Sequence, residues 1–335
     1  MEPADAPLRP KLEGFDFWKS IGSPRYVLAP MVDTSELPFR LLCKRYGTEL
    51  SYSPMLNQNT FVNAPADVRA TLWSTCPEER PVFAQIAGDD PERMLQAAKL
   101  VENECDAVDV NLGCPQSIAR RGNYGAFLQD QWDTVRKIIT TLHQHLKVPV
   151  TAKFRKQFTL ERSIGYAQLL VECGAQVICM HGRTRKQKGI LLGVADWDTM
   201  RIVRDSIPTT PFISNGSIHN MDDARRCFEV TNCQAVMSGE PIRRNPALFS
   251  GRAVPGRQLA GEYLEICKQY PVPIHMIRDH VHRMMMPTFD IHYDLRQELF
   301  TAPTIPVLEE RLAVLDRRIE VVHRSAAFLR GLMGV

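Results

Sequence analysis

The chain has 335 residues, of which 44% are hydrophobic and 24% are charged. These are ordinary proportions for a globular protein, and the length suits one barrel of about 250 residues followed by a small second domain. The formal net charge of +3 neither requires nor excludes an anionic partner, because binding depends on whether Lys and Arg gather on one face.

The cysteine content and the amino-terminal sequence indicate in which cellular compartment the protein is expected. The nine Cys are odd in number and no two have C-x-x-C spacing, so we expect no disulfide framework and no metal, and a reducing environment fits better. Neither a signal-like apolar stretch at the start nor a run of about 18 apolar residues occurs. We expect a monomer without membrane segments in the cytoplasm, with the nucleus as a second location. Residues 1–20 are predicted to form a flexible arm.

Short apolar runs rich in β-branched residues recur along residues 21–250, separated by amphipathic stretches. Strands that alternate with helices predict a parallel sheet, and eight such units predict an α/β fold of the closed (β/α)8 or TIM-barrel type. A doubly wound open sheet competes, but A-P-M-V-D at 29–33 stands where its G-x-G-x-x-G turn would be. The predicted strands are 26–31, 50–55, 82–87, 107–112, 148–154, 177–181, 211–215 and 235–238. The clearest helical stretches between them are 91–102, 132–145, 163–173 and 221–228.

The pattern changes beyond the last predicted strand. After residue 259 no strand-like run occurs, and apolar residues recur with helical spacing. We predict a smaller, all-helical domain over residues 251–335. Its helical stretches are 261–270, 277–286, 292–300 and 307–333.

The carboxyl ends of the strands are where barrels of this kind carry their active sites. Almost every predicted strand ends in polar or glycine-bearing positions, which a purely structural strand end would not need. The residues delivered there are Pro30, Met31, Gln85, Asn111, Cys114, Lys153, Arg155, His181, Arg183, Asn215, Gly216, Ser238 and Gly239.

Cys114 leaves an apolar strand and enters a Gly/Pro turn, with Gly113 allowing a tight path and Pro115 stiffening the loop. A buried structural Cys is the alternative to an active-site thiol, since free Cys is among the most buried residue types. The segment 116–125 that follows contains Arg120 and Arg121. It is either a solvated loop or a mobile lid over the site.

Lys153 and Arg155 are two apart on one strand, so both point to the same side. Two inward cations need a partner, and an anionic ligand or a reduced flavin would supply one. Lys153 alone would also suit a Schiff-base aldolase. His181 opens a polar loop, which favours a ligand-facing position over a core histidine.

Glycine turns follow the last two strands, at Asn215-Gly216-Ser217 and Ser238-Gly239-Glu240. Barrels often bind phosphate with the loops at this position, through backbone N–H groups. Basic residues at 120–121, 183–188 and 243–244 are predicted to share one rim, where a nucleic-acid backbone could dock.

Together these motifs resemble the tRNA-dihydrouridine synthases. The segment 118–130, P-M-V-D-x-S-E-L at 30–37 and K-Q-K-G at 186–189 resemble the eukaryotic type 1 branch, whose members act on D-loop uridines at tRNA positions 16 and 17. The matching pieces are A-P-M-V-D (29–33), F-A-Q (83–85), D-V-N-L-G-C-P (109–115), Y-G-A (124–126), K-F-R (153–155), H-G-R-T (181–184), N-G (215–216) and N-P-A-L-F (245–249).

The resemblance implies FMN across the barrel mouth, NADPH or NADH as reductant, and tRNA as substrate. Cys114 is implied as the acid that protonates C5 of the uracil. Many relatives have Gly-Arg where this chain has Gly239-Glu240, so Glu240 is expected to use its backbone N–H and turn its side chain away. The implied FMN contacts are Pro30, Met31, Val32, Gln85, Lys153, His181, Asn215, Gly216, Ser217, Gly239 and Glu240. The implied substrate contacts are Asn111, Arg120, Arg121, Arg155 and Arg183.

Two other functions stay open at this point. A flavin barrel could reduce a free pyrimidine or dihydroorotate, although this would leave the helical domain and the basic rim without a role. A catalytically silent RNA-binding barrel is the other possibility, and the set of Cys114, Lys153 and His181 argues against it.

Overall fold

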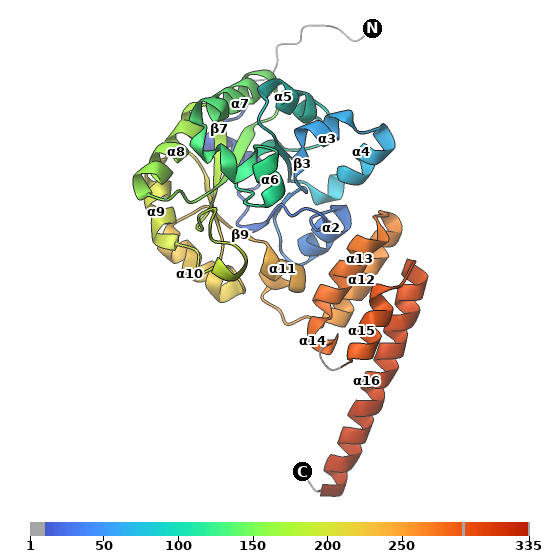
Figure 1. Cartoon of the computed structure of the whole chain (residues 1–335). Helices are drawn as coiled ribbons and strands as arrows, with labels where there is room; N and C mark the ends of the chain where they lie inside the picture. Colours follow the sequence, from blue (N-terminus) through green and yellow to red (C-terminus); the bar gives the residue numbers. More distant parts are fainter. Residues whose placement is uncertain (1–10, 290–291, 334–335) are drawn as a thin grey trace. The chain divides into compact units, whose positions relative to one another are not determined.

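The computed structural model describes residues 11–289 and 292–333, which form two compact units (Figure 1). The first unit ends at Ile242 and takes in Pro246–Ala253, and the second consists of Arg243–Asn245 and the chain from Val254 onward. The sequence placed the division after residue 250. Arg243 forms an ion pair with Asp279 (2.9 Å) inside the second unit.

The first unit is a closed barrel of eight parallel strands, as predicted. The eight barrel strands are β1, β2 and β4 to β9, and each pairs with the next barrel strand along the chain, so that β2 pairs with β4. The last strand, β9, pairs with β1 and closes the barrel. A two-residue strand, β3, adds to β4 at the mouth. The strands are β1 Tyr26–Leu28, β2 Leu50–Tyr52, β3 Leu56–Asn57, β4 Val82–Ala87, β5 Ala107–Leu112, β6 Val150–Arg155, β7 Ala175–His181, β8 Phe212–Asn215 and β9 Ala235–Ser238.

Helices surround the strands, as Figure 1 shows. Five of them begin at a side chain that accepts a hydrogen bond from the third residue of the helix, namely α3 at Asn57, α5 at Asp90, α8 at Thr159, α9 at Asp196 and α10 at Asn220. The helices are α1 Gly14–Ser20, α2 Leu37–Arg45, α3 Gln58–Asn63, α4 Ala66–Leu72, α5 Pro91–Lys99, α6 Ser117–Arg121, α7 Trp132–His145, α8 Leu160–Glu172, α9 Trp197–Asp205, α10 Met221–Thr231 and α11 Glu240–Arg244, which runs on into the second unit.

Helix α1 corrects the predicted flexible arm. Phe17 and Trp18 on α1 are only 4% and 3% exposed and belong to the core that fills the barrel. The Phe17 ring stacks on Phe83 of β4, with ring centroids 6.0 Å apart. The two aromatic side chains therefore close the barrel at the amino-terminal ends of its strands, and residues 1–10 of the predicted arm lie outside the described part.

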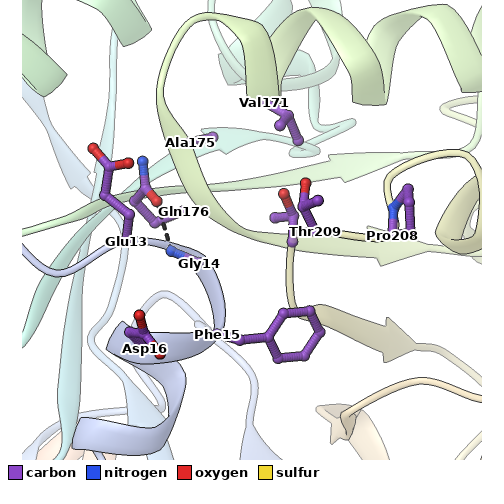
Figure 2. Close-up of a pocket in the computed structure, with 10 residues that line it drawn as sticks. Glu13, Gly14, Phe15, Asp16, Val171, Ala175, Gln176, Pro208 and Thr209 are labelled. Carbon is purple, nitrogen blue, oxygen red and sulfur yellow. Dashed lines mark hydrogen bonds between the residues drawn. The ribbon is translucent and has the colours of Figure 1, made fainter.

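A hollow of about 560 Å³ lies beside α1 at this closed end (Figure 2). Gln176, near the start of β7, accepts a hydrogen bond from the Gly14 backbone N–H (2.7 Å) and so ties α1 to the barrel. Its place at the start of β7 separates the hollow from the carboxyl end of that strand at His181.

Replacing Trp18 with Ala should lower the free energy of unfolding by about 3–5 kcal/mol, because it removes a large buried aromatic side chain. Lys19 is the matched control, since its side chain is 71% exposed and Lys19→Ala should change stability by less than about 0.5 kcal/mol. Urea unfolding of both variants measures this. Equal, small effects would show that α1 is not part of the core.

The second unit is helical, as the sequence predicts. Its core is formed by apolar side chains from all five of its described helices, and the buried His280 packs edge-on against the Tyr263 ring at 4.9 Å. None of the helices in the described part is long and apolar enough to cross a membrane. The helices are α12 Gly256–Gln269, α13 Ile274–Met284, α14 Met286–Phe289, α15 Tyr293–Phe300 and α16 Ile305–Met333.

Candidate active site

The strand register gathers the predicted site residues at the carboxyl end of the barrel. Asn111 of β5 pairs with Lys153 of β6, Arg155 pairs with His181 of β7, and His181 pairs with Asn215 of β8. Side chains at alternate positions of a strand share a face, so these residues face the barrel interior together. The mouth is therefore lined by polar side chains above an apolar barrel core.

Cys114 stands at this mouth on the turn that follows β5. All nine Cys lie in the described part of the chain; eight are buried and Cys114 is partly exposed. The Asn111 side-chain oxygen accepts hydrogen bonds from the backbone N–H groups of Gly113 (3.0 Å) and Cys114 (2.9 Å). The turn is held by these bonds, whereas a Cβ at Gly113 would make only ordinary contacts, the nearest at 3.5 Å.

The segment 116–125 contains α6 and packs against the Cys114 turn. The Ala126 backbone N–H donates to the Cys114 carbonyl (3.0 Å), and the partly exposed Cys114 packs against Tyr124 and Ala119. Gly125 has a φ of +65°, and a Cβ there would lie 2.8 Å from the Cys114 carbonyl oxygen. The glycine that the turn requires is therefore Gly125, which the sequence placed in the Y-G-A motif (124–126) without assigning it a role.

A buried carboxylate lies beneath the mouth. Asp109 of β5 is fully buried, and its two oxygens accept hydrogen bonds from Gln85 Nε2 (2.8 Å) and Thr151 Oγ1 (2.7 Å). Burial raises the pKa of Asp109 to about 6, although the bonds from Gln85 and Thr151 act in the opposite direction. Gln85 Oε1 in turn accepts from Asn111 Nδ2 (2.7 Å). Sequence reasoning missed Asp109, even though its spacing of two from Asn111 places both on one face of the strand.

Lys153 and Arg155 bind neutral acceptors. Lys153 Nζ donates to Asn215 Oδ1 (2.9 Å), and Arg155 Nε donates to the Gly113 carbonyl (2.8 Å). Burial lowers the pKa of Lys153, and burial together with the nearby charge of Arg183 lowers the pKa of Arg155 to about 10. The positive charge of this pair is therefore available to an anionic ligand.

His181 lies among these cations. Burial is the main cause that lowers the pKa of His181 well below its ordinary value of 6.5, and the charges of Arg155, Lys153 and Arg183 lower it further. Its Nδ1 accepts a hydrogen bond from the Arg183 backbone N–H (3.2 Å). The imidazole is therefore neutral at pH 7, with Nδ1 as the acceptor and Nε2 carrying the proton.

The depressed pKa of His181 predicts a pH dependence of folding. Below about pH 6.5, His181 takes up a proton in the unfolded chain but not in the folded protein. The free energy of unfolding therefore decreases as the pH is lowered, by at most about 1.4 kcal/mol per pH unit for one proton. In flavin-free protein, His181→Asn should reduce this slope between pH 7 and 5. Urea unfolding across that range measures it, with the exposed His145→Asn as control. An unchanged slope in His181→Asn would contradict a neutral His181.

The loop after β8, to which the sequence assigned a phosphate contact, is a tight turn built around Gly216. Gly216 has a φ of +116°, and a Cβ on it would lie 2.9 Å from the Ala195 Cβ. Ser217 also has a positive φ of +59°, and its hydroxyl oxygen accepts from Arg183 Nη2 (3.0 Å). Asn215 donates to the Met237 carbonyl (3.0 Å), which fixes the start of the turn.

Arg183 does not lie on the exposed rim where the sequence placed it. It is only 8% exposed, because its guanidinium donates to the Gly193 carbonyl (3.0 and 2.8 Å) as well as to Ser217. Burial lowers the pKa of Arg183. The side chain therefore lies beside the predicted phosphate turn, which favours a phosphate contact over the predicted contact with the RNA.

The loops after β9 and β1 lie next to each other. A Cβ on Gly239 would meet the Met31 Sδ at 3.6 Å, an ordinary contact, and Pro30 and Met31 are partly buried. Glu240 begins α11 and is exposed, in keeping with a side chain that turns away from a phosphate. Val32 is 56% exposed. The cofactor contacts assigned to these residues stay predictions.

The predicted basic rim is only partly present. Arg120 and Arg121 on α6 are exposed, and Lys188 Nζ donates to the Pro115 carbonyl (2.7 Å) next to the Cys114 turn. Arg243 instead pairs with Asp279 in the second unit. Within the first unit, the exposed cations of this predicted rim thus include Arg120 and Arg121, a few residues after Cys114.

The fold and this site define a class: a (β/α)8 barrel whose mouth holds three clustered cations, a neutral imidazole and an accessible thiol. The dihydroorotate dehydrogenase of Eimeria tenella, solved with ferulenol, has a similar barrel, with a TM-score of 0.50, 15% identity, and coverage of 81% of this chain and 88% of that one. At this identity the likeness concerns the fold alone.

Sequence comparison gives the family. The Dihydrouridine synthase (Dus) profile matches residues 27–301, and the chain therefore belongs to the dihydrouridine synthase family. It is 44% identical to the Rattus norvegicus "tRNA-dihydrouridine(16/17) synthase [NAD(P)(+)]-like", over 88% of this chain and 68% of that protein. It is 39% identical to the Schizosaccharomyces pombe "tRNA-dihydrouridine(16/17) synthase [NAD(P)(+)]", over 93% and 84%, and 32% identical to the Vibrio cholerae "tRNA-dihydrouridine synthase B", over 67% and 69%.

Proposed function

We propose that this protein reduces the C5=C6 bond of uridine to dihydrouridine in the D-loop of tRNA, with FMN as cofactor and NAD(P)H as reductant. The observation that carries the proposal is the accessible Cys114 thiol beside a cluster of cations. The C5=C6 bond of uracil is conjugated to a carbonyl, so its reduction needs a hydride at C6 and a proton at C5. Cys114 is the group at the mouth that can supply the proton.

The residues present fit FMN. Lys153, Arg155 and Arg183 gather three positive charges near one buried carboxylate, Asp109, and the turn at Gly216 packs so closely on Ala195 that only glycine fits there. An anionic cofactor with a phosphate balances such a site. Bound FMN, once reduced by NAD(P)H, supplies the hydride.

The protein's own groups complete the reaction. The Asn111 side chain and the Ala126 N–H hold the backbone of Cys114, and from this turn its thiol can protonate C5. Lys153 and Arg155 stabilise the negative charge that develops on the uracil oxygen. The reacting base has to leave its stack to reach this mouth, at a cost of a few kcal/mol.

Cys114→Ala should keep FMN and tRNA binding and lower the rate of dihydrouridine formation by about 10²–10⁴-fold, the range of a general acid. Mass spectrometry of tRNA nucleosides measures turnover, and flavin absorbance measures cofactor content. Cys173→Ala is the control, because this buried thiol lies at the end of an outer helix. Near-normal turnover in Cys114→Ala would remove the acid assignment.

The exposed pair on α6 should contact the tRNA backbone. Arg120→Ala combined with Arg121→Ala should weaken tRNA binding about three- to tenfold and make the salt dependence of the binding constant shallower, because fewer counterions are released. Lys19→Ala with Lys147→Ala is the matched control; both side chains are exposed, and they lie near the amino-terminal ends of the strands. Filter binding at several salt concentrations measures both, and equal losses in the two double variants would reject a specific basic edge.

The names of the relatives and the sequence support more specific proposals about the target uridines, the second unit, the oligomeric state and the location. We propose that uridines 16 and 17 are the targets, that the helical second unit binds tRNA, and that the protein acts as a monomer in the cytoplasm. Mapping dihydrouridine in tRNA from cells that lack the protein tests the positions. Loss at other positions only would reassign the substrate.

A further inference from the structure

A line of hydrogen bonds, fully buried at its inner end, runs from the centre of the barrel to the Cys114 turn. Asp109 Oδ2 accepts from Gln85 Nε2 (2.8 Å), Gln85 Oε1 accepts from Asn111 Nδ2 (2.7 Å), and Asn111 Oδ1 accepts from the Cys114 backbone N–H (2.9 Å). Asp109 and Gln85 are fully buried. The line therefore connects the buried carboxylate of Asp109 with Cys114, the residue proposed as the acid.

The direction of every bond in this line follows from the carboxylate. An ionised carboxylate only accepts hydrogen bonds, whereas an amide can present either its oxygen or its NH₂ group. Asp109 therefore makes Gln85 present its NH₂ group inward and its oxygen outward. Asn111 must then offer NH₂ to Gln85, which leaves its own oxygen for the Cys114 turn.

The opposite orientation would be unfavourable at the turn. If Asn111 were reversed, its NH₂ group would face the N–H groups of Gly113 and Cys114, and these donors would lose their acceptor. Buried or partly buried donors without acceptors are destabilising. The amide orientations, and with them the Cys114 turn, are thus specified from Asp109.

The surroundings of Asp109 fit a positioning role. Its second oxygen is held by Thr151 (2.7 Å), and the positive charge that acts on it is that of Lys153. Burying a carboxylate is costly even when it is hydrogen-bonded, and an apolar residue would fill this place in the barrel core at lower cost. The negative charge of Asp109 has a function if it fixes the orientations of the Gln85 and Asn111 amides.

We propose that Asp109 is a positioning residue that orients Gln85 and Asn111 and thereby holds the Cys114 turn in its reactive conformation. The effect of Asp109 on tRNA reduction rests on the proposed function, because Cys114 is the acid only in that reaction. The effect of Asp109 on the conformation of the turn is independent of the proposed function.

The test compares Asp109→Asn with the double variant Asp109→Asn/Gln85→Glu. In the single variant the new amide at position 109 can present either its oxygen or its NH₂ group to Gln85. The orientations of the Gln85 and Asn111 amides are then no longer specified. In the double variant the new carboxylate at position 85 accepts from both the amide at position 109 and Asn111, so Asn111 regains its orientation. Ser214→Ala is the control, since it removes another buried barrel hydrogen bond, from Ser214 Oγ to Thr231 Oγ1 (3.1 Å).

The first readout is the rate at which iodoacetamide alkylates Cys114 in flavin-free protein, followed by mass spectrometry of the peptide. We expect Asp109→Asn to react at least about threefold faster, because a loosened turn opens more often, and the double variant and Ser214→Ala to react like the wild type. A wild-type rate in Asp109→Asn, or an equal increase in Ser214→Ala, would overturn the proposal.

The second readout is dihydrouridine formation in tRNA. Asp109→Asn should be about ten- to a hundredfold slower, the fold-change that one hydrogen bond to a charged group represents. If the wild type forms no dihydrouridine, the proposed function fails while the alkylation result still decides the role of Asp109. Should Asp109→Asn not fold, Gln85→Met interrupts the same line, and unchanged alkylation in that variant would also overturn the proposal.

Discussion

Three cations held close together by neutral partners are the constraint on which this site depends. Lys153, Arg155 and Arg183 repel one another, and burial together with their charges keeps His181 neutral. Each binds an amide or backbone carbonyl oxygen of a different loop: Asn215, Gly113 and Gly193 respectively. The hydrogen bonds that satisfy the cations therefore also tie the loops after β5, β7 and β8 to one another.

The same arrangement leaves positive charge for a ligand. Neutral acceptors satisfy the N–H groups of a cation without cancelling its charge, so the mouth attracts an anion. Protein groups alone would make this cluster unfavourable, and a phosphate-bearing cofactor relieves it. The site thus gives up folding stability and gains affinity, as sites with buried charges commonly do.

The Cys114 turn depends on contacts from both sides. Asn111 holds its backbone N–H from the strand below, and the segment through Gly125 and Ala126 packs on it from above. The thiol therefore has a fixed backbone while its side chain stays accessible. At the opposite end of the barrel, Phe17 and Trp18 close the core, so the polar mouth is its open end.

The sequence by itself determined the elements and most of the chemistry. Alternating apolar runs and amphipathic stretches sufficed to predict eight parallel strands, because a side-chain period of two or 3.6 is a local property. The polar residues at the strand ends, Cys114 and Lys153 among them, followed because parallel strands in a barrel end at one face.

Only the tertiary structure decided which residues meet. Asp109 reads as one polar residue within an apolar run, and its bond to Gln85 depends on the register between two strands. Gly125 is required because its backbone passes within contact of Cys114, and Arg183 is buried because Gly193 and Ser217 fold over it. The aromatic pair of α1 likewise reads as part of a loose arm until the barrel offers it a core. Long-range contacts of this kind depend on where distant segments pack, which no local pattern contains.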